Sequence, residues 1–266
     1  MHTTQVGSHT VAFDDSGTGQ PVLFINGLAS NRMGWWKQVD VFSQKYRVIN
    51  MDNRDAGDSA PGMGPYSIAD MAGDTAGLIQ NLDLGATYIV AISMGGMIAL
   101  ELAIRYPQLV NKLVLASTTA GGPQSVNAKP EILALLMDVE GESIEARVRR
   151  IYPQLASEGY MDAHPEDLEQ IVKDSLARPM TPEGYQRQLG AIMGHATQGG
   201  AGQLDKISTP TLVLHGDDDP LVPYPNGQFL AEHIPGARLV TFPGVGHLLM
   251  IEAAEKFNRE VMAFLG

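Results

Sequence analysis

The sequence of 266 residues contains no cysteine, which excludes disulfides, a thiolate nucleophile and cysteine-bound metal sites. Positive charge is scarce, because 18 Lys and Arg stand against 30 Asp and Glu and leave a net charge of −12. An acidic chain of this kind is a poor match for nucleic acid or for an anionic membrane surface, so neither is expected as a partner. Gly-x-Gly-x-x-Gly and P-loop patterns are missing too, so no nucleotide or flavin cofactor is expected.

Long apolar runs are also missing. The longest apolar stretch, residues 89–104, is interrupted by Ser93 and Glu101 and is shorter than the roughly 20 residues that span a membrane. The first residues carry neither a basic nor an apolar segment, so no secretory signal is predicted and a cytoplasmic location is expected. Hydrophobic residues make up 44% of the chain, which is enough for a sizeable globular core.

Short apolar strands alternate with helical patterns along most of the chain. Strands are predicted at residues 10–14, 22–25, 47–51, 87–92, 112–116, 211–214 and 238–242, and helices at 31–44, 67–82, 94–106, 225–234 and 252–265. Residues 16–19 are predicted as a hairpin turn, and Ser67 as the N-cap of its helix with Asp70 three residues later. The alternation predicts an α/β fold: a mostly parallel twisted sheet flanked by helices.

The alternation stops after Thr119. Residues 121–205 contain no convincing strand and carry helical patterns at 132–139, 143–152, 165–177 and 182–193, which are separated by prolines. We therefore predict a helical cap, residues 121–205, inserted between strands of a core formed by residues 1–120 and 206–266.

One serine stands at the joint between a predicted strand and a predicted helix. The strand ends at Ile92, Ser93 follows, and Gly95 and Gly96 open the helix. A sharp turn of this kind projects the serine above the sheet edge. The helix N-terminus beneath it offers unpaired N–H groups to a developing oxyanion. Ser93 is therefore a candidate nucleophile, and the alternative is an ordinary helix N-cap.

A serine nucleophile needs a base and a group that orients the base. His247, flanked by glycine before the last helix, is the candidate base, because a near-neutral pKa suits it to accept and return a proton. The acidic run at residues 217–219 follows a buried strand and offers the orienting carboxylate. A solvated turn or a cation site is the alternative for this run, but no calcium-loop pattern accompanies it, so no metal is predicted.

The chain order Ser, Asp, His and five short motifs make the sequence resemble the α/β-hydrolase family over nearly its whole length. The motifs are Phe24–Leu28, Asp52–Ser59, the turn at Ser93, His215–Asp219 and Gly244–His247. Each motif is weak alone, and the resemblance depends on all of them standing in this order. Within the family the sequence is most similar to small, cofactor-free bacterial carboxylesterases and lactonases.

The resemblance implies a catalytic triad. Ser93 is the implied nucleophile and His247 the implied base. The family spacing Gly-x-x-Asp selects Asp219 as the orienting acid, with Asp217 as the runner-up. No cofactor is implied.

The resemblance also implies an oxyanion hole formed by the backbone amides of Leu28 and Met94. Three positions depart from the family patterns. Ala91 stands for the first glycine of Gly-x-Ser-x-Gly, Asn26 for a histidine in the loop after the second strand, and Asp55 for a glycine.

The reaction that follows is hydrolysis of a small-molecule carboxylic ester, with a short to medium acyl chain, by a monomer or homodimer. The alternatives are lactone opening, perhydrolysis, C–C bond hydrolysis or lyase chemistry on the same triad, and, least favoured, a non-catalytic binding module. The sequence does not determine specificity. Trp35, Met137, Tyr152 and Met193 can line a pocket, although core packing explains each of them equally well. His195 in the cap is a further candidate for substrate contact.

Overall fold

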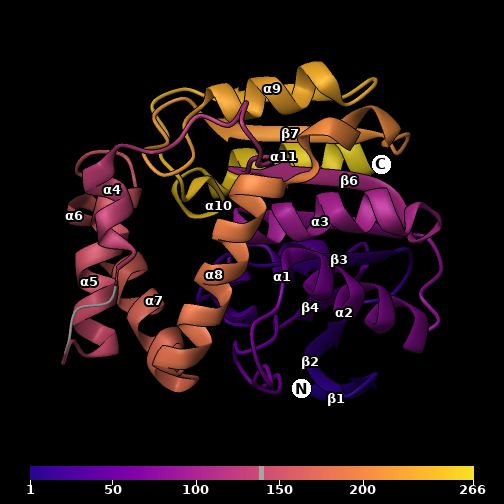
Figure 1. The fold of residues 1–266 in the computed structure, drawn as a ribbon, viewed down its shortest axis with the longest axis horizontal. Helices are drawn as coiled ribbons and strands as arrows, with labels where there is room; N and C mark the ends of the chain where they lie inside the picture. The colour runs from indigo at the N-terminus through magenta and orange to yellow at the C-terminus, as the bar shows by residue number, and fades with distance from the viewer. Residues whose placement is uncertain (138–140) are drawn as a thin grey trace.

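The computed structural model describes residues 1–137 and 141–266 and is built on one sheet of eight strands (Figure 1). The strands are β1 (His2–Val6), β2 (His9–Ser16), β3 (Pro21–Ile25), β4 (Arg47–Met51), β5 (Thr87–Ile92), β6 (Val110–Ala116), β7 (Thr211–Gly216) and β8 (Arg238–Phe242). They lie side by side in the order β1-β2-β4-β3-β5-β6-β7-β8. β1–β2 and β2–β4 pair antiparallel and every other pair is parallel, so the predicted mostly parallel sheet is confirmed.

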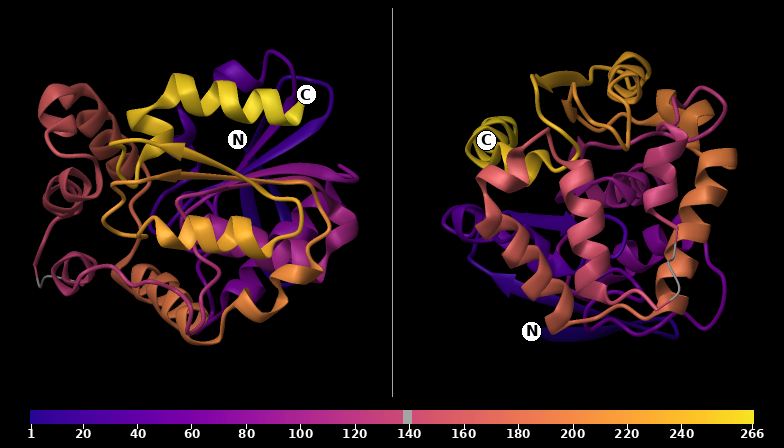
Figure 2. Two further views of the ribbon diagram at one scale, coloured as in Figure 1. Left: turned by 90° about the horizontal axis from the view of Figure 1, so that it is seen from above. Right: turned by 90° about the vertical axis from the view of Figure 1, so that its left-hand side faces the viewer.

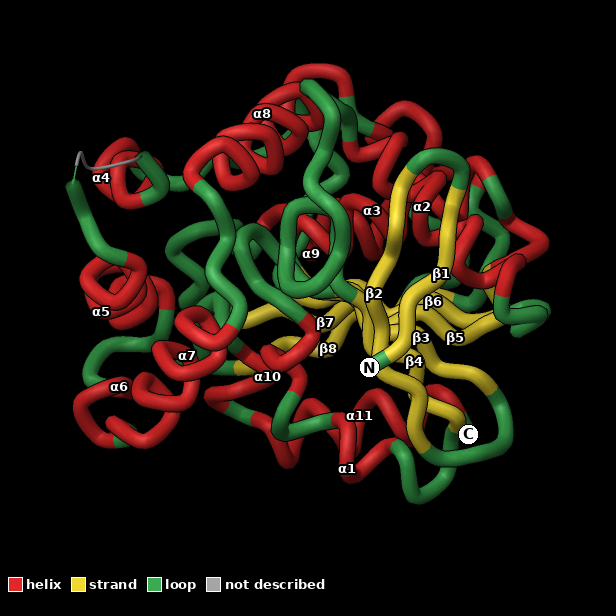
Figure 3. The backbone as a smooth tube through the Cα atoms, turned by 90° about the horizontal axis from the view of Figure 1, so that it is seen from below, coloured by secondary structure: helices red, strands yellow, loops and turns green. Residues whose placement is uncertain are grey.

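Helices cover both faces of the sheet, as Figure 3 shows. The helices of the core are α1 (Val39–Phe42), α2 (Ile68–Asn81), α3 (Met94–Arg105), α9 (Pro225–His233), α10 (Leu249–Glu252) and α11 (Ala254–Leu265). α2, α3 and α9 pack on one face, and α1 and α11 on the other. Successive strand residues point to opposite faces, so Ile89 and Ala91 of β5 pack with the first group while Val90 and Ile92 pack with the second.

The predicted helix at 67–82 is present as α2, and its start is the predicted one. The hydroxyl of Ser67 accepts a hydrogen bond from the amide of Asp70, and the Asp70 carboxylate accepts one from the amide of Ser67. This reciprocal pair satisfies two backbone donors that a helix N-terminus otherwise leaves without partners.

The N-terminal strands differ from the prediction. β1 was not predicted, and it forms a hairpin with β2 that turns at Gly7, where φ is +57°. Residues 16–19 are not a hairpin turn, because β2 pairs with β4 and β3 lies on the far side of β4. Pairing between strands distant in sequence decides this arrangement, and the local turn signal does not report it.

The single helix predicted at 31–44 is also wrong. The segment forms a 3-10 turn, η1 (Arg32–Trp35), followed by the one-turn helix α1. Tertiary contacts override the helical pattern, since the amide and guanidinium of Arg32 both bind the buried carboxylate of Asp52. Arg32 also binds Asp14 and Asp58, so this turn is held to three carboxylates.

Between β6 and β7 the described residues form helices and no strand. These helices are α4 (Pro130–Leu135), α5 (Ile144–Leu155), α6 (Tyr160–Ala163), α7 (Pro165–Ala177), α8 (Pro182–Gln198) and the 3-10 helix η3 (Gly200–Lys206). We call α4–α8 the cap helices. They lie beside the edge of the sheet where the parallel strands end (Figures 1 and 2). The predicted helix at 132–139 ends within residues 138–140, which lie outside the described residues.

Within the described ranges, no helix combines the length and the apolar character that crossing a membrane requires.

Candidate active site

Ser93 lies at a strained turn between β5 and α3. Its φ of +56° and ψ of −123° place a non-glycine residue in a region that L-amino acids rarely adopt. The turn is fixed from both sides, because the Ser93 amide donates to the carbonyl of Ala116 at 3.0 Å and its carbonyl accepts from the Thr118 hydroxyl at 2.7 Å. The half-buried side chain is thereby held above the N-terminus of α3.

The two glycines after the serine let neighbouring backbone and side chains approach it. A Cβ at Gly95 would lie 2.3 Å from the carbonyl oxygen of Ile25, and a Cβ at Gly96 would lie 2.5 Å from the Thr118 side chain. Ala91, the departure from the family pattern, is a fully buried residue of β5 paired with both neighbouring strands, so its methyl group is accommodated in the sheet.

Asp219 and His247 form a buried hydrogen-bonded pair. The distance from His247 Nδ1 to Asp219 Oδ2 is 2.8 Å, and the two residues are only 4% and 5% exposed. The other oxygen of Asp219 accepts from the amides of Leu221 and Val222 at 2.9 and 2.8 Å. A carboxylate can only accept, so the tautomer that donates from Nδ1 to Asp219 leaves the Nε2 lone pair of His247 available as a base.

The neighbours of Asp219 have other contacts. Asp217 is exposed, and its carboxylate accepts from the amide of Gly244 at 2.6 Å, which joins the ends of β7 and β8. His215 is fully buried, and its Nε2 lies 2.8 Å from the carbonyl of Val222 and 3.6 Å from Asp219 Oδ2. Burial lowers the pKa of His215, so this imidazole is a neutral structural neighbour of the acid.

Leu28 lies on the loop after β3, opposite the first turn of α3. Gly27, just before it, is so close to Ser93 that a Cβ there would lie 3.1 Å from the serine Cβ. In the part of the chain that the structure describes, neither the Leu28 amide nor the Met94 amide donates to a protein acceptor. Two free N–H groups next to a serine hydroxyl can bind an oxyanion.

Asn26, which stands where the family pattern has histidine, closes this loop with hydrogen bonds of its own. Its side-chain amide donates to the backbone carbonyl of Asn31 at 2.7 Å, and the backbone carbonyl of Asn26 accepts from the Asn53 side chain at 3.0 Å. The Asn31 side chain in turn accepts from the amide of Met33 at 2.9 Å. The substitution therefore leaves the loop internally bonded, and Leu28 stays beside Ser93.

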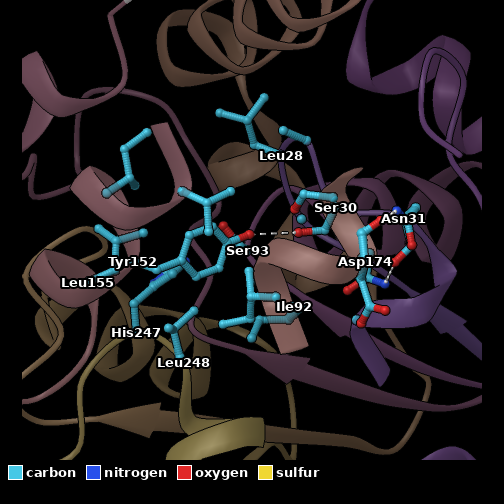
Figure 4. A pocket seen from close by; sticks show the side chains of 18 of the residues that line it. Leu28, Ser30, Asn31, Ile92, Ser93, Tyr152, Leu155, Asp174, His247 and Leu248 are labelled. Carbon is cyan, nitrogen blue, oxygen red and sulfur yellow. Dashed lines mark hydrogen bonds between the residues drawn. The ribbon is translucent and has the colours of Figure 1, made fainter. Parts of the chain in front are cut away.

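A cavity of about 150 Å³ lies between the Ser93 turn, this loop and the cap helices, and Figure 4 shows its lining. Ser93, Leu28 and His247 all line it. The cap contributes mainly apolar side chains to its wall, among them Val148, Ile151, Leu155 and Ile171. Of the five predicted site residues, Ser93, Leu28 and His247 thus line one cavity. Asp219 is hydrogen-bonded to His247, and Met94 follows Ser93 in the chain.

Not all of the residues that the sequence suggested for the pocket lining reach the cavity. Tyr152 lines the cavity, and its hydroxyl lies 3.5 Å from that of Ser30. Trp35 is fully buried in the core, and its neighbour Trp36 lines the cavity instead. Met137 and Met193, which are 48% and 60% exposed, face solvent. His195 does not line the cavity but packs against Gly121.

Two residues that fix the site were not found from the sequence. Gln188 of α8 is fully buried; it accepts from the amide of Ala29 and donates to the carbonyl of Arg54, both at 2.9 Å. Glu252 accepts from the amides of Gly246 and Leu248, on either side of His247. Neither belongs to a recognisable motif, because their partners are backbone groups brought close only by folding.

Gln188 gives a testable prediction, because it holds the amide next to Leu28. Gln188→Met keeps the volume but leaves two part-buried backbone groups without their side-chain partner, at a cost of up to about 1–3 kcal/mol each. We expect kcat/KM to fall about 10–100-fold, and the affinity for a trifluoromethyl ketone, which forms an oxyanion on the serine, to fall in proportion.

Gln154→Met, at an exposed position of α5, is the matched control and should change neither quantity. A loss of kcat/KM with unchanged trifluoromethyl ketone affinity would show that Gln188 does not act through the loop after β3 that carries Leu28.

Among residues 1–137 and 141–266, no group of three or more His, Asp or Glu side chains has the arrangement of a metal site.

Residues 20–254 match the profile of the family described as alpha/beta hydrolase fold. The chain is 34% identical over 245 residues to a poly(3-hydroxyalkanoate) depolymerase of Ectopseudomonas oleovorans, covering 92% of this chain and 84% of that one. It is 30% identical over 246 residues to 3-oxoadipate enol-lactonase 2 of Acinetobacter baylyi, covering 92% and 88%. The crystal structure of the enol-lactonase from Burkholderia xenovorans LB400 superimposes with a TM-score of 0.87 at 27% identity, over 99% of both chains. This chain is therefore a member of the α/β-hydrolase family.

Proposed function

We propose that this protein hydrolyses carboxylic esters of short to medium acyl chain through an acyl-enzyme on Ser93. One observation carries the proposal. A strained serine and a histidine that is hydrogen-bonded to a buried carboxylate line the same small cavity, beside two backbone amides that have no acceptor among the described residues.

In the proposed reaction, Nε2 of His247 takes the proton from the Ser93 hydroxyl as Oγ attacks the ester carbonyl. The amides of Leu28 and Met94 bind the negative charge that develops on the carbonyl oxygen. His247 then gives its proton to the leaving alcohol, and water repeats the sequence on the acyl-serine. Asp219 holds the imidazole in the required tautomer throughout.

Lactone hydrolysis is the second candidate, because two of the similar proteins are named enol-lactonases. A lactone is a cyclic ester, so the same steps open it and leave the alcohol attached to the released acid. Turnover of a set of simple lactones, measured beside acyclic esters of equal carbon number, decides which class is preferred.

The size of the cavity predicts the acyl-chain preference. A volume of about 150 Å³, walled by the cap helices, holds a short acyl chain, whereas a long chain must displace packed side chains. Overpacking of this kind costs about 1–3 kcal/mol, so kcat/KM for a nitrophenyl dodecanoate is expected to be about tenfold or more below that for the butanoate.

The measurement is kcat/KM across nitrophenyl esters from acetate to dodecanoate, with the rate followed through the solubility limit of the longest ester. A preference for emulsified long-chain ester, or a rate jump above that limit, would contradict the proposed preference.

A further inference from the structure

Helix α7 presents to the cavity one acidic side chain that the proposed reaction does not use. Ile171, Asp174 and Ser175 of α7 and its C-cap residue Arg178 line the cavity. Their spacing of three and four residues places them on one face of the helix. In the view of Figure 4, Asp174 and Asn31 lie on the opposite side of Ser93 from His247. Asp174 thus belongs to the part of the cavity away from the acid–base pair.

Only one of the two carboxylate oxygens of Asp174 has a hydrogen-bond donor among the described residues. The residue is 7% exposed, and Oδ1 accepts from the Gln170 side chain at 2.8 Å. Oδ2 is buried and has no hydrogen-bond partner among the described residues. Lys173 and Arg178 act on it only at longer range, and burial dominates, raising the pKa of Asp174. A buried carboxylate oxygen without a donor is unfavourable, and a donor on a bound molecule removes that cost.

The charges around the cavity identify the missing group as a neutral donor. Arg178 and Arg147 also line the cavity, but both are ion-paired, Arg178 with Asp58 at 2.6 Å and Arg147 with Glu142 at 3.6 Å. An ammonium group would enter a cavity that two guanidinium groups also line, and a carboxylate would enter a cavity that Asp174 lines. A hydroxyl group satisfies Oδ2 without meeting like charge on either side.

We infer that the substrate is an ester that carries a hydroxyl group, and that Asp174 accepts a hydrogen bond from this hydroxyl. Asp174 is then a specificity-determining residue, remote from the reacting carbonyl. This inference rests on the proposed ester hydrolysis at Ser93, and it does not assign the hydroxyl to the acyl or to the alcohol part of the ester.

The test compares matched pairs of esters in two arms. The acyl arm sets nitrophenyl hydroxybutanoate against nitrophenyl butanoate, and the alcohol arm sets hydroxypropyl butanoate against propyl butanoate. A hydrogen bond to a charged group predicts a preference in kcat/KM of about 10–100-fold for the hydroxylated member in at least one arm. The arm that shows it identifies the part of the substrate that Asp174 contacts.

Asp174→Leu, of similar shape but without an acceptor, should reduce this preference, measured as the ratio of kcat/KM within each ester pair, to about twofold or less. Asp174→Asn retains one carbonyl acceptor and should lower the preference by about threefold or more, so it decides the question if the leucine variant does not fold. Asp162→Leu, at an exposed position of α6, is the matched control and should keep the wild-type preference.

Two outcomes overturn the inference: a wild-type enzyme with no hydroxyl preference in either arm, or an unchanged preference in the Asp174 variants. Failure of the proposed function is distinguishable, because then no ester of either kind is turned over and a phosphonate does not label Ser93.

Discussion

Replacing Ser93 with alanine is expected to lower kcat for ester hydrolysis by about 10⁴–10⁶-fold, because the acyl-enzyme route disappears and only binding and oxyanion stabilisation are left. In the wild type, an organophosphonate should label Ser93 alone, which mass spectrometry of the digested protein identifies. The amides of Leu28 and Met94, which have no acceptor among the described residues, remain in the variant, so the residual rate measures what binding and the proposed oxyanion hole contribute together without the nucleophile.

Ser93→Gly separates the loss of chemistry from the strain at this turn. At a φ of +56° and ψ of −123°, glycine relieves a conformation that costs serine or alanine about 1–3 kcal/mol. Both variants should be inactive, and the glycine variant should unfold at a higher temperature than the alanine variant. A serine at such a position lowers the stability of the fold, and its hydroxyl is held above the turn.

Ser208→Ala, at an exposed position before β7, provides the control and should keep full activity and full labelling at Ser93. Labelling of a different residue, or appreciable turnover by Ser93→Ala, would remove Ser93 from the nucleophile role.

The parallel sheet could be predicted because its signals are local. β5 reads as an apolar, β-branched run that meets a helical pattern at one residue, and the structure has the strand end at Ile92 and the helix begin at Met94. The predictions failed where long-range contacts decide. The hairpin predicted at residues 16–19 is missing because β2 pairs with the distant β4, and the segment after Asn31 depends on ion pairs between Arg32 and carboxylates on two other segments.

In the candidate site, too, the residues with a local sequence signal were predicted and those with only long-range contacts were not. Ser93 and His247 stand in short motifs that marked them as candidates, and the resemblance to the family selected Asp219 from its acidic run. Gln188 was not predicted, because its partner Ala29 lies 159 residues away, and no pattern of residues records a contact with a backbone amide. Asp174 was missed for a similar reason, since an unpaired carboxylate looks like any solvated acid until the cavity is known.

The division into a core (residues 1–120 and 206–266) and a cap (residues 121–205) stays a prediction. The cap helices nevertheless contact both functional loops. The carbonyl of Leu155 accepts from the amide of His247 at 2.8 Å, and the Gln188 side chain accepts from the amide of Ala29 in the loop that carries Leu28. Displacing the cap helices would therefore disturb the proposed base and the proposed oxyanion hole together, in addition to opening the cavity.

Asp219→Asn is expected to lower kcat by about 10²–10⁴-fold with a smaller change in KM. An asparagine amide can donate to Nδ1 of His247, which places the ring proton on Nε2 and removes the lone pair that must accept the serine proton. The carboxamide also loses the charge that stabilises the imidazolium formed in the reaction. The measurement is kcat with a short nitrophenyl ester, together with the rate of phosphonate labelling, which depends on the same proton transfer.

Asp217→Asn is the matched control for Asp219→Asn, two residues away in the same acidic run. Asp217 is exposed and, among the described residues, accepts from the amide of Gly244, a bond that an asparagine oxygen can keep, so kcat should stay within about tenfold of the wild type. The comparison tests whether the geometry selects the acid, because Asp219 alone of the two reaches His247. If the Asp217 variant is the one that loses activity, the hydrogen bond between Asp219 and His247 is structural, and the assignment of the acid is wrong by two residues.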